Sequence, residues 1–449
     1  MTIGKRINKC DLILIILFII ISRLLFYFLL EIRPLEKIDF YMQIFPIEFL
    51  YQDLFKTLIN GHSQPFGYNL FIGLLLKIFS GNELYVVKCI HLINIFITFV
   101  LTILSLKISI ELFEINKLKK FFLIIILTFN PFFIFWENFM LYAHISLFLH
   151  VVIFYHLIIY FRFNILGSYF LIFLSLTLLT FIHALYHPFL LLLIFFIIFF
   201  LKKKFILKEF KIFLILFILS LTPLIKNYFL FNSFGNSSWM GFNWYATIHA
   251  IDHEYRDICY FGDITDADIK KFLDKKKIQD DLIYKKEFLL EKKSEFNNIG
   301  YIYKSKICNT KTIQFIFKNP VDWIISRAYY FFMSVGKFSI DYSADSLLGW
   351  RDSFGIMETI QNNDILKRSR QIFLIFLKFF CIFFLLKKIF THNQNYYYKK
   401  TLLVYLSIVT YVVLVSHIFN AWEQERFMYS FWILNIIIIN HILNFVKKN

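Results

Sequence analysis

The chain of 449 residues is 59% hydrophobic, contains 61 phenylalanines and carries a formal net charge of +17. Soluble globular proteins are about half apolar, so this composition excludes a soluble domain and indicates a polytopic membrane protein. Much of the positive charge lies in short segments beside apolar runs, as in cytoplasmic loops, and so gives no indication of nucleic-acid binding.

The apolar runs are each close to the ~20 residues that cross a bilayer, and they predict an all-α protein with about ten transmembrane helices. The basic N-terminus is placed in the cytoplasm, and the first run is too long for a cleaved signal peptide. The predicted spans are 11–30, 84–113, 120–136, 139–161, 167–183, 188–201, one that follows the basic segment 202–211 and ends near 226, 371–388, 401–418 and 428–445.

Two further apolar segments are predicted to lie at the membrane surface. Residues 67–80 are short, and counting them as a span would reverse every later loop, so we expect an interfacial or re-entrant helix. Residues 321–338 are amphipathic. If they crossed the bilayer, the basic segment 387–400 would lie outside, against the positive-inside rule, so an interfacial helix is expected there too.

These assignments divide the chain into three parts. Residues 1–226 form an N-terminal transmembrane domain that includes a first outer loop at 31–66. Residues 227–370 form a larger outer-face domain with a charged, solvated helical stretch at 263–295, and residues 371–449 form the C-terminal transmembrane helices. Cys259 and Cys308 share the outer-face domain, so they can pair if that compartment is oxidising.

The first outer loop is rich in carboxylates, with Glu31, Glu36, Asp39, Glu48 and Asp53. A carboxylate that is partly shielded from water near a membrane can act as a general base. Asp39 is the best candidate because its neighbours are apolar or aromatic and would desolvate it. The alternative is that these acids are simply solvated loop residues.

Two other outer-face segments carry polar residues suited to binding. In residues 221–245, the seventh span ends with Pro223, Lys226 and Asn227. A loop of Asn, Ser, Gly and aromatic residues follows, and it can hold a phosphate or sugar hydroxyls. The alternative is an ordinary turn that caps a helix. Beside the last span, Glu425 and Arg426 either anchor the helix or present a guanidinium to a lipid phosphate.

No metal site is assigned. His183 and His187 are four residues apart, but no third ligand lies nearby and Pro188 interrupts the helix. The acid-rich first loop leaves a divalent cation open, without a defined ligand spacing. His144, His150 and His156 are interpreted as core histidines, and Arg23 near the outer end of the first span is interpreted as a snorkelling side chain.

Taken in order, these segments resemble the GT-C glycosyltransferases of the protein O-mannosyltransferase and aminoarabinose-transferase type. The resemblance covers most of the chain except about 250–320, and no single motif carries it. The matching positions are the acidic first loop, then Tyr51, Gly61, Pro65 and Gly81; Asn130-Pro131 ahead of the outer Glu137; Pro223, Asn227, Ser237-Ser238, Gly241 and Asn243; and Glu425-Arg426-Phe427.

The resemblance implies transfer of a monosaccharide from a polyprenyl-phosphate carrier to a lipid, glycan or protein acceptor. The site would face the outside of a bacterial cytoplasmic membrane. The family's first-loop acid is carried onto Asp39, with Glu48 open because it lies closer to Tyr51, as the family's acid does. Lys226, where the family has Arg, would hold the carrier phosphate. The implied substrate-binding residues are Lys226, Asn227, Asn243, Glu137, Glu425 and Arg426.

Two other functions fit a chain of this kind. An O-antigen-type polymerase or ligase also has about ten spans and a large outer loop, but it relies on outer-loop arginines, whereas this loop is rich in lysine. A transporter or lipid flippase predicts spans that carry charges or are broken by Gly and Pro. The apolar runs here look largely uninterrupted, with polar groups at their outer ends, which favours an enzyme.

Overall fold

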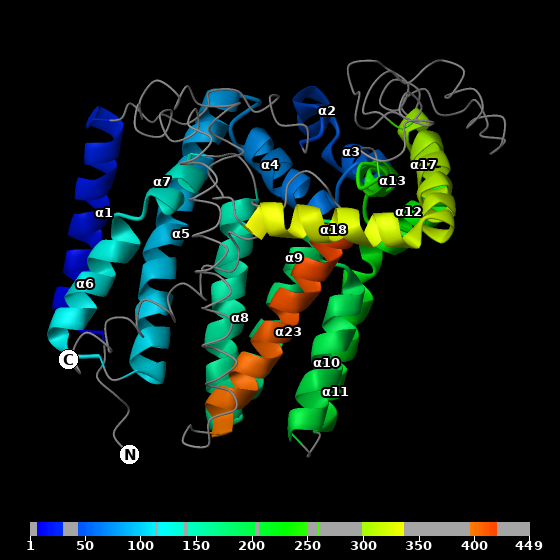
Figure 1. Ribbon diagram of the computed structural model, residues 1–449. Coiled ribbons are helices and arrows are strands. Elements are labelled where there is room, and N and C mark those ends of the chain that lie inside the picture. Colours follow the sequence, from blue (N-terminus) through cyan, green and yellow to red (C-terminus); the bar gives the residue numbers. More distant parts are fainter. Residues whose placement is uncertain are drawn as a thin grey trace, which may run out of the picture.

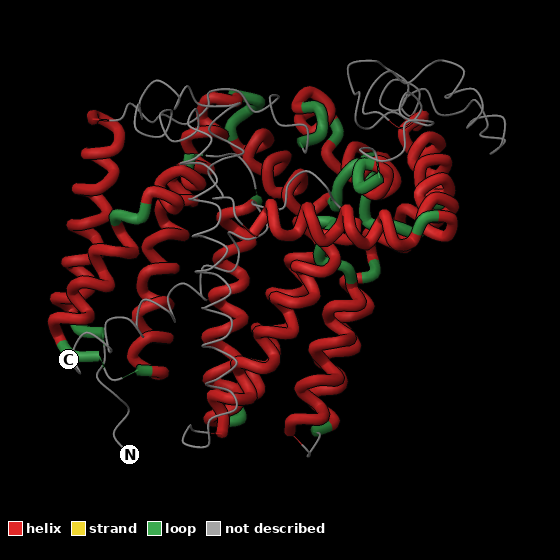
Figure 2. Tube along the Cα trace, viewed as in Figure 1, coloured by secondary structure: helices red, strands yellow, loops and turns green. Residues whose placement is uncertain are grey.

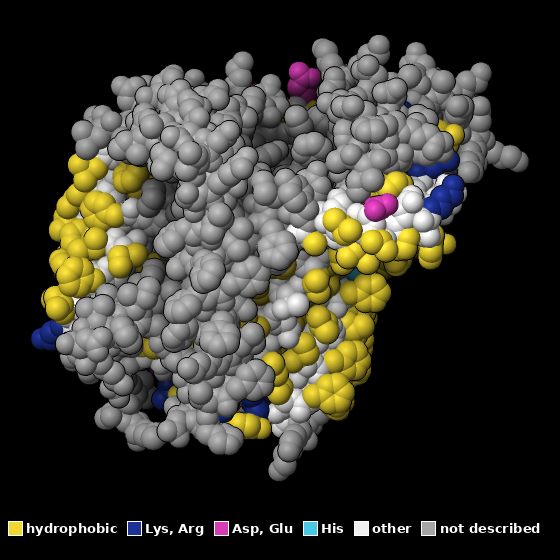
Figure 3. Space-filling model, in the orientation of Figure 1, with side chains coloured by type: hydrophobic (Ala, Val, Ile, Leu, Met, Phe, Trp, Pro, Cys, Tyr) yellow, Lys and Arg dark blue, Asp and Glu magenta, His cyan; other side chains and the backbone are white. Residues whose placement is uncertain are grey.

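The computed structural model describes residues 7–29, 44–113, 115–138, 142–202, 206–248, 259, 299–335 and 396–419. Every regular element in these ranges is a helix, and several of the longer helices, such as α5, α8 and α23, run between two ends of the molecule (Figures 1 and 2). Hydrophobic side chains cover both flanks of the described surface (Figure 3). The predicted all-α class is therefore confirmed for the described part of the chain.

Four of the described helices are long and apolar enough to cross a membrane. They are α5 (Glu83–Leu112), α8 (Ala143–Phe163), the nearly continuous pair α11 (Leu207–Ser220) and α12 (Thr222–Phe231), and α23 (Tyr396–Phe419). Helices α1 (Lys9–Leu29), α9 (Leu166–Ile182) and α10 (Pro188–Lys202) also form where spans are predicted. The predicted spans 371–388 and 428–445 lie outside the described residues, so the total of about ten remains a prediction.

The predicted span 120–136 is not one helix. It consists of α6 (Lys117–Thr128) and α7 (Pro131–Glu137), separated at Phe129 and Asn130. Pro131 has no amide hydrogen to donate to the preceding turn, and its ring disfavours helical backbone at the residue before it, so the helix ends there. With 12 residues, α6 is about 18 Å long, well short of a bilayer core of ~30 Å.

Helix α8 lies at the centre of the bundle, packed against α5, α9 and α23. Several of its apolar side chains, including Leu147, Ile153 and Leu157, are fully buried in one continuous core. A helix with no polar face is expected where several other helices pack around it.

The first outer loop forms short helices at one end of the bundle. Helices α2 (Ile47–Gln52), α3 (Leu54–Asn60) and α4 (Phe66–Ile78) lie together there, and α4 packs against α5 and α9 (Figure 1). Gly81, with φ of +80°, turns the chain from α4 into α5, a conformation that favours glycine. The position of α4 agrees with the predicted interfacial or re-entrant helix.

The outer-face domain contributes α13 (Met240–Tyr245), α17 (Ile299–Lys318) and α18 (Pro320–Val335) at the same end. Helix α18 lies across the bundle in Figure 1, as an interfacial helix would. Its side chains Val321, Ile324 and Ile325 are 59–65% exposed, and they share one helix face. The predicted solvated stretch 263–295 lies outside the described residues.

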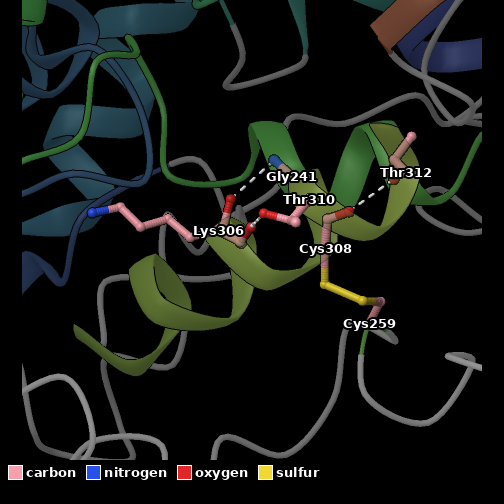
Figure 4. The surroundings of a disulfide bond; sticks show 7 residues. Gly241, Cys259, Lys306, Cys308, Thr310 and Thr312 are labelled. Carbon is pink, nitrogen blue, oxygen red and sulfur yellow. Dashed lines mark hydrogen bonds between the residues drawn. A yellow bond between two sulfur atoms is a disulfide. The ribbon is translucent and has the colours of Figure 1, made fainter. Parts of the chain in front are cut away.

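A disulfide joins Cys259 to Cys308 of α17, with the two Cα atoms 5.7 Å apart (Figure 4). The pairing that the sequence left open is therefore confirmed. Structural disulfides persist in oxidising compartments, so the bond is consistent with an outer position for this end of the molecule.

Candidate functional site

The two outer-face segments of the resemblance meet in what we call the polar seam, formed by residues 58–64 of the first loop and 226–241. The Ser238 amide donates to the His62 carbonyl at 2.9 Å, and the His62 ring Nδ1 lies 2.8 Å from the Ser238 hydroxyl. The Ser237 hydroxyl donates to the Ser63 carbonyl. Segments more than 160 residues apart are thus joined by several hydrogen bonds.

The residues expected to end the seventh span lie within helix α12 instead. Pro223 occupies the first turn of α12, where its missing amide hydrogen costs nothing. The helix continues past residue 226 and ends at Asn232, whose φ of 50° is the left-handed conformation common at helix C-termini. The expected loop is therefore short, and Met240–Tyr245 forms α13.

Lys226 reaches from α12 into the first outer loop. Its ammonium donates to the carbonyls of Leu58, at 3.2 Å, and of Gly61. These carbonyls lie at the C-terminal end of α3, where a cation is favoured by the last unpaired carbonyls and the helix dipole. The bonds give Lys226 a role in fixing the first loop, and they compete with the expected contact to a carrier phosphate.

Asn227 closes the turn that follows α12. Its side-chain amide nitrogen donates to the Gly235 carbonyl at 2.7 Å, and its backbone carbonyl accepts from the Ser233 backbone amide at 3.2 Å. This is the helix-capping turn that the sequence offered as the alternative reading. Asn243 lies in α13, where its side chain is half-buried and its amide bonds to the Trp239 carbonyl at 3.0 Å.

Three asparagines of the polar seam carry buried atoms with no hydrogen-bond partner among the described residues. They are Oδ1 of Asn60, Oδ1 of Asn227, and both Oδ1 and Nδ2 of Asn236. Each residue is at least 95% buried. Unsatisfied buried amides are rare in folded proteins, so these atoms need an explanation.

Glu137 is not in an exposed outer loop. It ends α7 and forms a buried ion pair with Arg23 of α1, with Nε donating to Oε2 at 3.0 Å and Nη2 to Oε1. The interpretation of Arg23 as a snorkelling side chain is therefore wrong. Its Nη1 donates to the Thr128 carbonyl at 2.6 Å, just before the break between α6 and α7.

Further polar groups surround the Arg23–Glu137 pair. Thr98 of α5 donates to Glu137 Oε1 and lies 2.9 Å from Nε2 of His144. The side-chain amide of Asn94 donates to the Glu137 carbonyl at 3.1 Å. A buried ion pair persists when additional hydrogen bonds satisfy its remaining atoms. His144 is buried and hydrogen-bonded, as predicted for a core histidine.

Of the remaining sequence candidates, two acids of the first loop lie within the described residues and three residues lie outside them. Glu48 is exposed in the first turn of α2 and accessible to a ligand. Asp53 caps α3 by accepting from the Lys56 amide at 3.3 Å, and hydrogen bonds from Lys56 hold the pKa of its carboxyl below the ordinary value. Asp39, Glu425 and Arg426 lie outside the described residues.

Histidines His183 and His187 each support a turn between α9 and α10. Nδ1 of His183 accepts from the Leu185 amide at 3.0 Å, and Nδ1 of His187 accepts from the Phe189 amide at 3.3 Å. No cluster of three His, Cys, Asp or Glu side chains suited to a metal occurs within the described ranges.

Comparison of the chain with protein-family models, with curated proteins and with solved structures finds no match. The function is therefore argued from the residues and their geometry.

Proposed function

We propose that this protein is a membrane glycosyltransferase that moves a monosaccharide from a polyprenyl-phosphate carrier to a lipid, glycan or protein acceptor. The polar seam is the observation that supports this most, because it joins the first outer loop to the second segment of the resemblance at one end of the molecule. Glu48 belongs to the same loop, and Asp39 precedes the described part of that loop by a few residues. The site faces the outside of a bacterial cytoplasmic membrane.

The chemistry needs few groups because a polyprenyl phosphate is already a good leaving group. A carboxylate deprotonates or aligns the acceptor hydroxyl, and a cation stabilises the departing phosphate. Asp39 or Glu48 is the base. Arg426 is assigned to the phosphate, since its guanidinium can bind two oxygens and Lys226 already serves two carbonyls.

The structure also narrows the proposed substrate-binding set. Glu137 is left out because its carboxylate is buried and paired with Arg23. Asn227, in the polar seam, and Asn243, in α13, stay in the proposed substrate-binding set. Glu425 stays in the set as the neighbour of Arg426. A divalent cation in the acid-rich loop stays open.

The test uses purified protein in nanodiscs with polyprenyl-phosphate sugars, scoring the release of free polyprenyl phosphate. We expect the base variant, Asp39→Asn or Glu48→Gln, to lose about 10²- to 10⁴-fold in rate. Arg426→Ala should be impaired as well. Glu83→Gln, which changes a carboxylate in the first turn of α5, is the matched control.

Wild-type rates in both Asp39→Asn and Glu48→Gln would refute the base assignment. Repeating the assay with a chelator decides whether a divalent cation is required. Lipid-diphosphate oligosaccharides are offered in a parallel assay. An O-antigen-type polymerase or ligase would consume only those carriers, which distinguishes it from the proposed transferase.

A second candidate, a transporter or lipid flippase, is favoured by one specific observation. The third predicted span is broken at Asn130–Pro131, and a buried ion pair adjoins the break. Discontinuous helices and intramembrane charges are common in transporters. In liposomes, a fluorescent polyprenyl-phosphate sugar and an impermeant quencher would reveal movement between leaflets. Such movement, without release of polyprenyl phosphate, would favour this candidate over the transferase.

A further inference from the structure

The polar seam contains more buried hydrogen-bonding atoms than the described residues satisfy. Asn227 and Asn236 lie on one side and Asn60 on the other, and four of their amide atoms have no partner within the described ranges. Folded proteins in general leave few such atoms in their interiors, because each loses its bond to water without a replacement. A ligand that enters the seam would supply the missing bonds.

The bonds that close the seam join the segments that carry these three residues. Asn60 directly precedes Gly61, whose carbonyl accepts from Lys226. Asn227 directly follows Lys226 in α12. Asn236 is bracketed by two bonded neighbours, since the Gly235 carbonyl accepts from Asn227 and the Ser237 hydroxyl donates across to the first loop. The three asparagines therefore lie in segments that are hydrogen-bonded to one another.

The kind of atom defines the chemistry of the ligand. Three of the four unsatisfied atoms are carbonyl oxygens and one is an amide nitrogen. Amide oxygens only accept hydrogen bonds, so the ligand must present mainly donors, with at least one acceptor. Several adjacent hydroxyl groups meet this requirement, because each hydroxyl both donates and accepts.

Charge excludes the other common ligands. Residues 58–64 and 226–241 contain no Asp or Glu, and the half-buried Lys226 places its ammonium within the seam. A ligand ammonium would be repelled by Lys226 and would find no carboxylate. A ligand carboxylate has no donors at neutral pH and would face the three amide oxygens.

We propose that the polar seam recognises an uncharged, polyhydroxylated sugar, read by the amides of Asn60, Asn227 and Asn236. The inference rests on the proposed function in taking this sugar to be the one on the polyprenyl-phosphate carrier. Because the amides are buried, the sugar binds when the first loop and the segment 226–241 separate. Neutral hexoses are accepted, amino sugars are rejected because Lys226 repels their ammonium, and uronic acids are rejected because a carboxylate offers the amide oxygens no donor.

The test measures binding, which does not depend on turnover. Nanodisc-embedded wild type and Asn236→Ala are titrated with polyprenyl phosphate alone and with its neutral hexose, amino-sugar and uronic-acid derivatives. We expect wild type to bind the neutral derivative at least about tenfold tighter than either charged one. Asn236→Ala should weaken binding of the neutral derivative about tenfold and leave polyprenyl phosphate unchanged.

Ser233→Ala, a half-buried residue of the same turn, is the matched control and should bind like wild type. Because the Asn236 amide has no partner in the described chain, its removal should not lower the unfolding temperature, which shows that the variant is folded. Equal or tighter binding of a charged sugar, unchanged hexose binding by Asn236→Ala, or no preference over bare polyprenyl phosphate would overturn the inference. Selective hexose binding without release of polyprenyl phosphate would instead refute the transferase and keep the sugar site.

Discussion

At the scale of single residues, the Arg23–Glu137 pair joins helices α1 and α7 through a buried ion pair. Both side chains are buried, and the guanidinium also holds the Thr128 carbonyl at the break between α6 and α7. Removing one partner leaves the other as an uncompensated buried charge. We expect Glu137→Gln to lower the free energy of unfolding by about 3–5 kcal/mol, measured by denaturation in detergent.

The matched control is Glu111→Gln, which breaks the partly exposed pair of Glu111 with Arg162 and should cost only about 0–1 kcal/mol. The double variant Arg23→Met/Glu137→Gln should recover much of the loss, because no buried charge then remains. A Glu137→Gln protein as stable as the control would show that this pair is solvated and not buried.

At the scale of elements, α13 packs closely against α17, and Gly241 of the polar seam lies at that contact. The Gly241 amide donates to the Ser305 hydroxyl at 2.9 Å, and a Cβ at Gly241 would lie only 1.9 Å from the Ser305 carbonyl oxygen. Backbone cannot yield as a flexible side chain can. We expect Gly241→Ala to destabilise the protein by roughly 1–3 kcal/mol and to impair the transferase, as measured by thermal unfolding and polyprenyl phosphate release.

Gly235→Ala is the control at this scale, since a Cβ there meets its nearest neighbour at an ordinary 3.6 Å. It lies in the same seam segment as Gly241, so it tests whether any added methyl group is harmful. If the two alanine variants behaved alike, tight packing of α13 on α17 would not be what fixes this segment.

At the scale of the whole molecule, the disulfide and the basic loops both predict which side of the membrane each end of the bundle faces. Cys308 is bonded to Cys259 at the end that holds the polar seam, while the exposed Cys10 lies at the start of α1 beside the basic N-terminus. In a Cys89→Ser/Cys381→Ser background, an impermeant maleimide added to intact cells should label Cys259 and Cys308 only after reduction. Cys10 should be labelled only after lysis.

Labelling of Cys308 in intact cells without reduction would contradict the disulfide. Labelling of Cys10 in intact cells would reverse the orientation and move the proposed site to the cytoplasm. The two cysteine sets thus test the bond and the topology separately.

Much of the helical plan could be predicted from the sequence, because hydrophobic runs and helix breakers act locally. The positions of α1, α5, α8, α9, α10 and α23 follow the apolar runs, and Gly and Pro mark several ends. The break at Pro131 was missed because the surrounding run is uniformly apolar, although Asn130-Pro131 was the signal that could have shown it. In the candidate site, Glu137 and Lys226 make structural contacts that the sequence did not predict. Asp39 and Arg426 lie outside the described residues and stay predictions.

The sequence by itself determined that this is a helical membrane protein with polar segments at one face, because burial in a bilayer depends on the composition of each segment. Only the tertiary structure decided which polar groups meet. Arg23 and Glu137 are 114 residues apart, and Lys226 finds its carbonyl partners 165 and 168 residues away. Such partners are set by how the helices pack, which no local sequence pattern encodes. A residue that the sequence predicts to bind a ligand can therefore make a structural contact in the fold.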